Sequence, residues 1–182
     1  FESIARDGGF ACVMDFALPE LGNLLAGSAI NAGKDRMLNA GRAGIPQIVA
    51  PGCYDLVDII GWQAVPEKWA QHLQHAHNRL LTSVVLESDE RAEVAKAHCE
   101  QLATAKGPVV VLLPEDGLGE WDREEADLHN AGGLAQFLAE MEAGMPVNVE
   151  AHRLACHIND AEFADKALEV FDGWCASGVV KV

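Results

Sequence analysis

The sequence predicts a three-layer α/β/α Rossmann-like sandwich: a mainly parallel sheet of about five strands with helices on both faces. Short apolar runs, typical of strands buried on both faces, alternate with segments whose apolar residues repeat at helical spacing. This alternation favours parallel strands joined by helical crossovers. With 182 residues, 49% of them hydrophobic, the chain can build one core, so we expect a single domain over residues 1–182.

Five segments are predicted to be strands. Four are apolar almost throughout; the fifth alternates apolar and polar residues until Arg153 interrupts it, which is typical of an edge strand. The five are Phe10–Phe16, Ile45–Ala50, Leu81–Leu86, Val109–Leu113 and Val147–Leu154.

Five further segments each carry one apolar stripe at helical spacing. Gly107 and Pro108 follow the third, and Asn159 with Glu162 is a capping-box pattern that would open the fifth. The stripes are Leu18, Leu21, Leu25; Trp62, Val65, Trp69, Leu73; Ala92, Ala95, Cys99, Leu102; Leu134, Phe137, Leu138, Met141; and Phe163, Ala167, Val170, Phe171, Trp174.

Composition excludes several classes of function. The net charge is −15, with 28 acidic against 13 basic residues and no basic patch, which argues against nucleic-acid and membrane-surface partners. No run is long enough to cross a bilayer and no signal peptide is visible, so we expect a cytoplasmic protein. Five cysteines without a C-x-x-C pair suggest neither a disulfide framework nor a zinc site. Because the chain opens without Met, we expect it to be part of a longer protein.

Polar residues follow four of the predicted strands. Because ligands of open parallel sheets bind beyond the carboxyl ends of the strands, these residues are expected to face one pocket. His157 paired with Asp55 or Asp15 would be an acid and a base, and the glycine turns would bind an anion. The alternative is that Asp and Asn cap helices and glycines close turns. The segments are Asp15 and Glu20; Pro51 to Asp55; Pro114 to Gly119; and His157 to Asp160.

Three weaker signals leave their alternatives open. Cys53 is either a nucleophile at a strand-to-helix turn or a small buried apolar residue. His72, His75 and His77 lie near the end of a predicted helix. His72 and His75 would share a helix face suited to a metal, or the histidines would interact with the helix dipole; we expect no metal. Arg36 is either an anchor for a small anionic ligand or part of a solvated helix face. Walker, Rossmann-fingerprint and G-x-S-x-G motifs are absent.

A collinear set of short motifs extends over nearly the whole chain. It resembles the C-terminal half of an uncharacterised family related to the ATP-binding domain of the plant tobamovirus-resistance protein. The motifs are DFALPE at 15–20, AGKDR at 32–36, GIPQIVAPGCYD at 44–55, VP at 65–66, HN at 77–78, LP at 113–114 with Gly117 and Asp122, and HIND at 157–160 followed by FA at 163–164.

The resemblance implies a protein of two Rossmann-like halves, in which ATP is bound mainly by the N-terminal half that is missing here. This half would line the cleft between them and form a homo-oligomer surface. The ligand-binding residues that it implies, together with the pattern above, are Glu20, Arg36, Gly52, Cys53, His77, Asn78, Gly117, Asn159 and Asp160.

The chain departs from the family pattern at three places. Val85, Leu86 and Glu87 stand where the family carries an Arg-Thr-Thr run, and Gly119 replaces an expected serine. The Phe-Tyr/His-Asp-Pro segment of the family is lost in the region Glu124 to Ala131. An altered ligand preference would follow.

Three functions remain in view. The leading hypothesis is a ligand-binding half-domain of an ATP- or nucleotide-binding protein. The alternatives are a hydrolase or lyase that uses His/Asp chemistry on a small carboxylated or phosphorylated metabolite, and a protein-interaction module. The site hypotheses require that the segments around residues 15, 52, 77, 117 and 157 meet at one rim.

Overall fold

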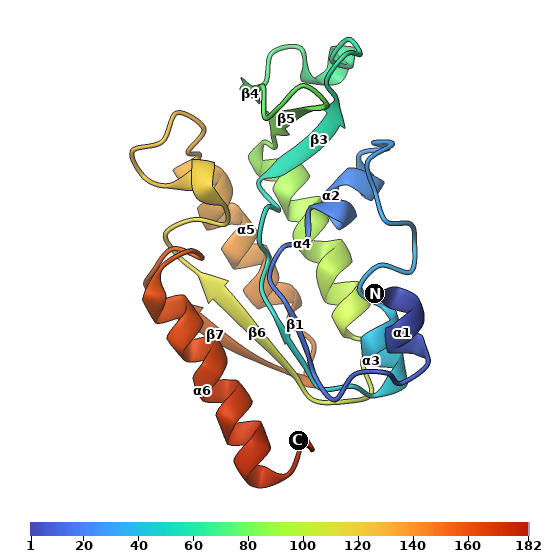
Figure 1. Ribbon diagram of the computed structural model, residues 1–182. Coiled ribbons are helices and arrows are strands. Elements are labelled where there is room, and N and C mark those ends of the chain that lie inside the picture. Colours follow the sequence, from blue (N-terminus) through green and yellow to red (C-terminus); the bar gives the residue numbers. More distant parts are fainter. Residues whose placement is uncertain (182) are drawn as a thin grey trace.

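A four-stranded parallel sheet with helices on both faces forms the body of the protein (Figure 1). The computed structural model describes residues 1–181. The strand order is β1 (Val13–Asp15), β2 (Gln47–Val49), β6 (Val109–Pro114) and β7 (Val149–Leu154), with every neighbouring pair parallel. The predicted three-layer sandwich is confirmed, and so is the edge position of the last strand.

The helices divide between the two faces of this sheet. Side chains of α2, α4 and α5 pack into one core, and α6 covers the opposite face. The short helices α1 and α3 pack against each other beside β1. The bounds are α1 (Glu2–Arg6), α2 (Pro19–Leu25), α3 (Asn39–Ala43), α4 (Ser88–Leu102), α5 (Ala131–Gly144) and α6 (Ala161–Ser177), with 3₁₀ turns η1 (Glu67–Trp69) and η2 (Glu120–Asp122).

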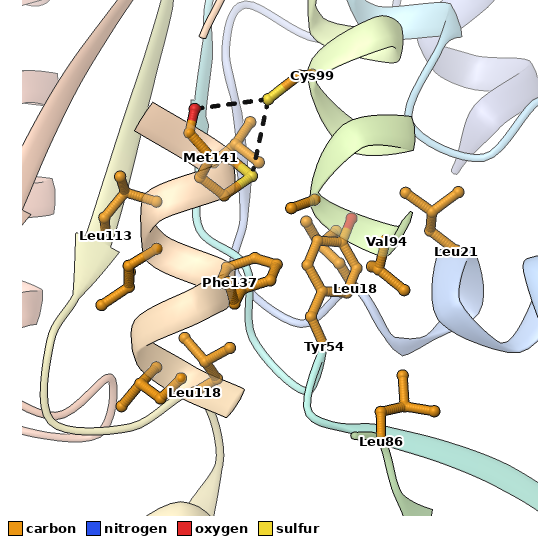
Figure 2. Close-up of a cluster of buried hydrophobic side chains, with 14 of the residues drawn as sticks. Leu18, Leu21, Tyr54, Leu86, Val94, Cys99, Leu113, Leu118, Phe137 and Met141 are labelled. Carbon is orange, nitrogen blue, oxygen red and sulfur yellow. Dashed lines mark hydrogen bonds between the residues drawn. The ribbon is translucent and has the colours of Figure 1, made fainter. Parts of the chain in front are cut away.

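The apolar run in β6 exists because both faces of this strand are buried. Val111 and Leu113 point into the core shared with α4 and α5, whereas Val110 and Leu112 point into the core under α6. Figure 2 shows the first core, where Cys99 of α4 meets Met141 of α5; the Cys99 Sγ lies 3.7 Å from the Met141 carbonyl oxygen. A polar substitution in β6 would therefore disturb one core or the other.

The predicted strand at Leu81–Leu86 forms, but not in the parallel sheet. β5 (Leu81–Val85) lies in a separate antiparallel sheet, between β3 (Leu56–Ile60) and β4 (Gln74–His75). The apolar run predicts a buried strand but does not identify the strand with which it pairs. That strand is β3, which the sequence pattern did not predict. The parallel sheet consequently has four described strands instead of about five.

The predicted helix from Trp62 to Leu73 is wrong. Only the 3₁₀ turn η1 forms there, because Pro66 disfavours helical backbone at the residue before it. Trp69 alone is buried, and its indole N–H donates to Glu90 Oε1 at 2.8 Å. His72, His75 and His77 therefore do not share a helix face.

The predicted capping box of the last helix is also wrong. Asp160, not Asn159, precedes α6, and the Asn159 amide instead donates to Glu120 Oε2 at 2.9 Å. Within residues 1–181, no helix is long and apolar enough to span a bilayer.

Candidate functional site

The loops that follow the four parallel strands meet at the carboxyl edge of the sheet. Backbone hydrogen bonds join them: the Leu18 N–H donates to Gly52 O (2.9 Å), the Cys53 N–H to Leu118 O (2.8 Å) and the Ile158 N–H to Gly117 O (3.2 Å). The predicted rim therefore forms around residues 15, 52, 117 and 157.

The small sheet reaches this rim through Trp121. The imidazole of His77 lies edge-on to the Trp121 ring with centroids 4.9 Å apart, and His75 lies 4.6 Å from the same ring. Asn78, by contrast, closes the turn before β5: its side-chain oxygen accepts from the Leu80 and Leu81 N–H groups at 2.7 and 3.0 Å. Of the predicted His77-Asn78 pair, only His77 touches a residue of the rim.

Two glycines at the rim allow the loops to approach closely. A Cβ at Gly52 would lie 1.9 Å from the Phe16 carbonyl oxygen. Gly117 has φ +132°, and a Cβ there would lie 2.6 Å from Cδ2 of His157. Their immediate role is thus to bring the loops together.

A pocket of about 580 Å³ opens between these loops; we call it the edge pocket. Phe16 and Phe163 meet edge to face within it, with ring centroids 5.2 Å apart. Neither Lys nor Arg is among the described residues that line it. The lining residues are Phe16, Ala17, Gly52, Cys53, Leu118, Gly119, Glu120, Trp121, Ile158, Asn159, Asp160, Phe163 and Ala164.

Arg36, Asp15 and Glu20 lie together, away from the edge pocket. The Arg36 guanidinium donates to both carboxylate oxygens of Asp15, to Oδ1 at 2.9 Å, and it also lies 3.4 Å from the Glu20 carboxylate and 3.7 Å from that of Glu2. Three carboxylates thus surround the one guanidinium predicted to anchor an anion. Its charge is already neutralised inside the protein.

His157 is buried, and both of its ring nitrogens bond the main chain. Nδ1 accepts from the Asn159 N–H at 3.1 Å, which leaves the proton on Nε2 to donate to Gly119 O at 2.9 Å. The structure therefore does not pair His157 with Asp55 or Asp15. The backbone N–H of His157 donates to Asp160 Oδ2 at 2.9 Å, and this bond lowers the pKa of Asp160.

A second pocket of about 600 Å³ lies beside β7 and α5, where His157 and Asp160 also belong to the lining. Its two arginines are paired: Arg153 with Glu115 and Glu142, and Arg123 with Asp160. No unpaired cation therefore distinguishes this pocket among the described residues.

Asp55 is 1% exposed, and neither of its carboxylate oxygens has a hydrogen-bond partner among the described residues. Arg91 and Asp122 are fully buried nearby, with Arg91 Nη1 3.8 Å from Asp122 Oδ2. Burial, followed by the negative charge of Asp122, raises the pKa of Asp55 to about 7. This carboxyl group can therefore exchange a proton near neutral pH.

Cys53 lines the edge pocket in a left-handed conformation, with φ 64°. Burial and the neighbouring carboxylate of Asp55 raise the pKa of its thiol to about 12. Since the thiolate is the nucleophilic form, the thiol stays protonated at neutral pH and favours the small-apolar interpretation of this residue.

Comparison with known proteins places these residues in a family. The C-terminal domain of the uncharacterised protein family UPF0261 matches residues 1–175. The chain belongs to the UPF0261 family. A UPF0261 protein of Brucella melitensis is 44% identical over 180 residues, which cover 99% of this chain and 43% of that protein. A UPF0261 protein of Mesorhizobium japonicum is 31% identical over 172 residues.

A plant protein is a more distant relative. The ToMV resistance protein Tm-1(GCR237) of Solanum lycopersicum is 25% identical over 172 residues, 93% of this chain and 23% of the plant protein. This UPF0261 chain spans less than half the length of the relatives that it matches, and it aligns with 43% of the Brucella protein. The resemblance inferred from the motifs is confirmed.

The departures from the expected UPF0261 motif have structural counterparts. Val85 and Leu86 are buried at 2% exposure, and Glu87 precedes α4, where its N–H donates to the carboxylate of Glu90 at 2.9 Å. In this UPF0261 chain, these positions therefore serve packing and helix capping.

The sequence pattern did not identify Arg91 as a buried charged residue, nor Trp121 as a residue that lines the edge pocket. Arg91 lies in the charged segment Ser88-Asp-Glu-Arg, which has the composition of a solvated first helical turn. For Asp122 the sequence indicates only a position in a family motif, and not that its carboxylate is buried. The one signal for Trp121 is its place in the long irregular segment after β6, where binding residues concentrate.

Proposed function

We propose that this UPF0261 domain binds the nucleoside part of a nucleotide, with ATP as the first candidate, in the edge pocket. The observation that carries the proposal is the pocket itself, which four loops build at the carboxyl edge of a parallel sheet. Phe16, Trp121 and Phe163 offer apolar surface to a base. Glu120, Asn159 and Asp160 offer acceptors to ribose hydroxyls.

The phosphates, or any other small anionic group, would be held by the N-terminal half of the same protein. Glu120 and Asp160 in the edge pocket repel phosphate, and no cation among its lining residues offsets them. The matched relatives are more than twice as long as this chain, which leaves room for such a half. The cofactor would then bridge the two halves.

Calorimetric titration of the full-length protein with ATP, adenosine and inorganic triphosphate tests this proposal. Ala164→Phe fills the pocket from an exposed position of α6, and Ala176→Phe is the matched control at the far end of the same helix. We expect Ala164→Phe to weaken the binding of adenosine and of ATP at least about tenfold, and the control variant to leave both affinities unchanged. Adenosine that does not bind, or that binds equally well to both variants, would overturn the proposal.

A hydrolase or lyase acting on a small carboxylated or phosphorylated metabolite is the second candidate. It is favoured by the pKa of Asp55, about 7, which suits a general acid or base. Because His157 is bound to the main chain through both nitrogens, the chemistry would rest on Asp55 alone. Turnover that disappears in Asp55→Asn but persists in His157→Gln would support it; turnover unaffected by Asp55→Asn would exclude it.

We further propose that the β3–β5–β4 sheet contacts the acidic body of a second copy. Trp62, Leu73 and Leu80 are 70%, 53% and 61% exposed there, and the sheet stands at the end of the molecule in Figure 1. Residues 61–81 carry Lys68 and Arg79 against Glu67, on a chain of net charge −15. Sedimentation of Trp62→Ser with Leu80→Ser should show a smaller species than the wild type; an unchanged species would contradict this interface.

A further inference from the structure

Room for one methyl group lies beside the Asp55 carboxylate. A Cβ built on Gly119 would lie 3.5 Å from Asp55 Oδ1, 3.9 Å from Oδ2 and 3.9 Å from Cys53 Sγ, which are ordinary contact distances, and no atom beyond Gly119 and its two chain neighbours would be nearer. The backbone of Gly119 is extended, with φ −161° and ψ 166°, so glycine is not required there for conformational reasons. What distinguishes the position is the space that it leaves open.

This space adjoins the edge pocket. Gly119 and Cys53 both line the pocket, while Asp55 lies directly behind them with both oxygens unpartnered. A buried carboxylate without hydrogen bonds is costly, because it has given up its hydration without a replacement. The nearest cation, Arg91, does not hydrogen-bond Asp55; its Nε donates instead to Leu86 O at 3.0 Å.

We infer that the wall of the edge pocket at Gly119 is a subsite for a hydrogen-bond donor of the ligand, a hydroxyl or amino group, with Asp55 as the acceptor. A neutral or cationic donor fits better than an anionic group, because the Asp55 carboxylate behind the wall and Glu120 and Asp160 in the lining would repel an anion. The inference refines the function proposed above and rests on it for the identity of the ligand. It assigns Gly119 the role of keeping the subsite open.

A serine at position 119 tests the subsite without any ligand. Its hydroxyl, one bond beyond Cβ, can donate to Asp55, whereas alanine adds only the Cβ. We compare Gly119→Ser with Gly119→Ala in full-length protein, each with Asp55 present and with Asp55→Asn, by thermal unfolding at pH 8. Gly173→Ala is the control, because nothing lies within 4 Å of that added Cβ.

We expect serine to give a higher Tm than alanine when Asp55 is present, and this advantage to shrink with Asp55→Asn, whose uncharged amide oxygen is a weaker acceptor than a carboxylate. Equal Tm values for serine and alanine beside Asp55 would overturn the subsite, whatever the protein binds.

Binding then tests its occupant. 2′-Deoxyadenosine, 3′-deoxyadenosine and inosine each lack one donor group of adenosine: the 2′-hydroxyl, the 3′-hydroxyl and the 6-amino group. We expect the wild type to lose about tenfold or more in affinity for the one analogue that lacks the donor. Asp55→Asn should reduce that discrimination, because its amide oxygen is a weaker acceptor, and Gly119→Ser should weaken adenosine binding by a similar factor.

The two proposals fail in different ways. If adenosine does not bind but serine stabilises the protein through Asp55, the nucleoside proposal falls and the donor subsite stands. If adenosine binds with no preference among the analogues, or Gly119→Ser leaves its affinity unchanged, the nucleoside proposal stands and the subsite falls.

Discussion

Tyr54 and Asp55 are neighbours in the sequence and are buried to the same degree, yet their surroundings differ. The Tyr54 hydroxyl shares a hydrogen bond of 3.0 Å with Nδ1 of His98, and its ring meets Phe137 in the core (Figure 2). The Asp55 carboxylate has the charges of Arg91 and Asp122 nearby, and neither of its oxygens has a hydrogen-bond partner among the described residues. Beside Tyr54, one buried nitrogen of His98 has no hydrogen-bond partner. Beside Asp55, four buried side-chain atoms of Asp55 and Arg91 have none.

The difference shows that burial of a polar group does not by itself indicate a site. A tyrosine whose hydroxyl is bonded inside a close-packed core stabilises the fold. A carboxylate with unused acceptors beside a pocket has capacity left for a ligand. Four predictions test this contrast.

The largest effect is expected from Arg91→Met. Removing the guanidinium leaves Asp55 and Asp122 as two buried carboxylates without a cation, which should lower the free energy of unfolding by about 3–5 kcal/mol. Urea unfolding at pH 7 measures it, with Lys96→Met, an exposed position of α4, as a control expected to change little. A loss below about 1 kcal/mol would mean that the carboxylates of Asp55 and Asp122 find other favourable interactions, as the Tyr54 hydroxyl does.

The pH dependence of Asp55 comes next. Because the folded-state pKa is raised to about 7 from 3.8, the folded protein binds the extra proton between these values, and stability falls as the pH rises from about 4 to 7. The contribution of this shift to the free energy of unfolding is on the order of 4 kcal/mol. Urea titrations across this range should show a less negative slope in Asp55→Asn than in wild type; parallel curves would contradict the raised pKa.

His98 should act in the same pH range with the opposite sign. Burial lowers its pKa to about 3 from 6.5, so its stabilising effect is complete above pH 6.5 and is lost as the pH falls toward 3. His98→Phe should therefore lose less stability than wild type between pH 6.5 and 4 in the same titrations. A variant that follows the wild-type acid limb would show that folding does not lower the pKa of His98.

The smallest effect is expected from Tyr54→Phe. It removes the hydroxyl and leaves His98 Nδ1 unpaired, while the ring keeps its contact with Phe137. We expect a loss of about 1–2 kcal/mol at pH 7 by thermal unfolding, with no change in adenosine affinity. A changed affinity for adenosine would mean that Tyr54 contributes to ligand binding as well as to stability.

The sequence predicted the elements whose own periodicity carries the information. The run Val109–Leu113 became a strand buried on both faces, and the stripes around Cys99, Phe137 and Phe163 became α4, α5 and α6. The rim was also predictable, because residues that follow parallel strands share one edge. What failed depended on long-range partners: β5 paired with β3, and only Trp69 of the expected helix found a buried place.

The candidate site was predicted less completely than the fold. Its glycines, Cys53 and Asp160 were found from position, but the pairing of His157 with Asp55 was not, since backbone groups took both imidazole nitrogens. The empty space beside Gly119 has no sequence signal at all, because it depends on how two loops happen to meet.

The strand order of the parallel sheet has a consequence for the whole protein. The described strands follow the chain order without reversal, and β1 pairs only with β2 among them. Doubly wound sheets gain their ligand crevice where successive crossovers leave in opposite directions. A strand contributed by the rest of the polypeptide beside β1, with its connecting helix next to α6, would cover Met14, now 39% exposed. The strand order of the enlarged sheet would then reverse direction at β1, which would place the ligand crevice next to the loop that begins at Asp15.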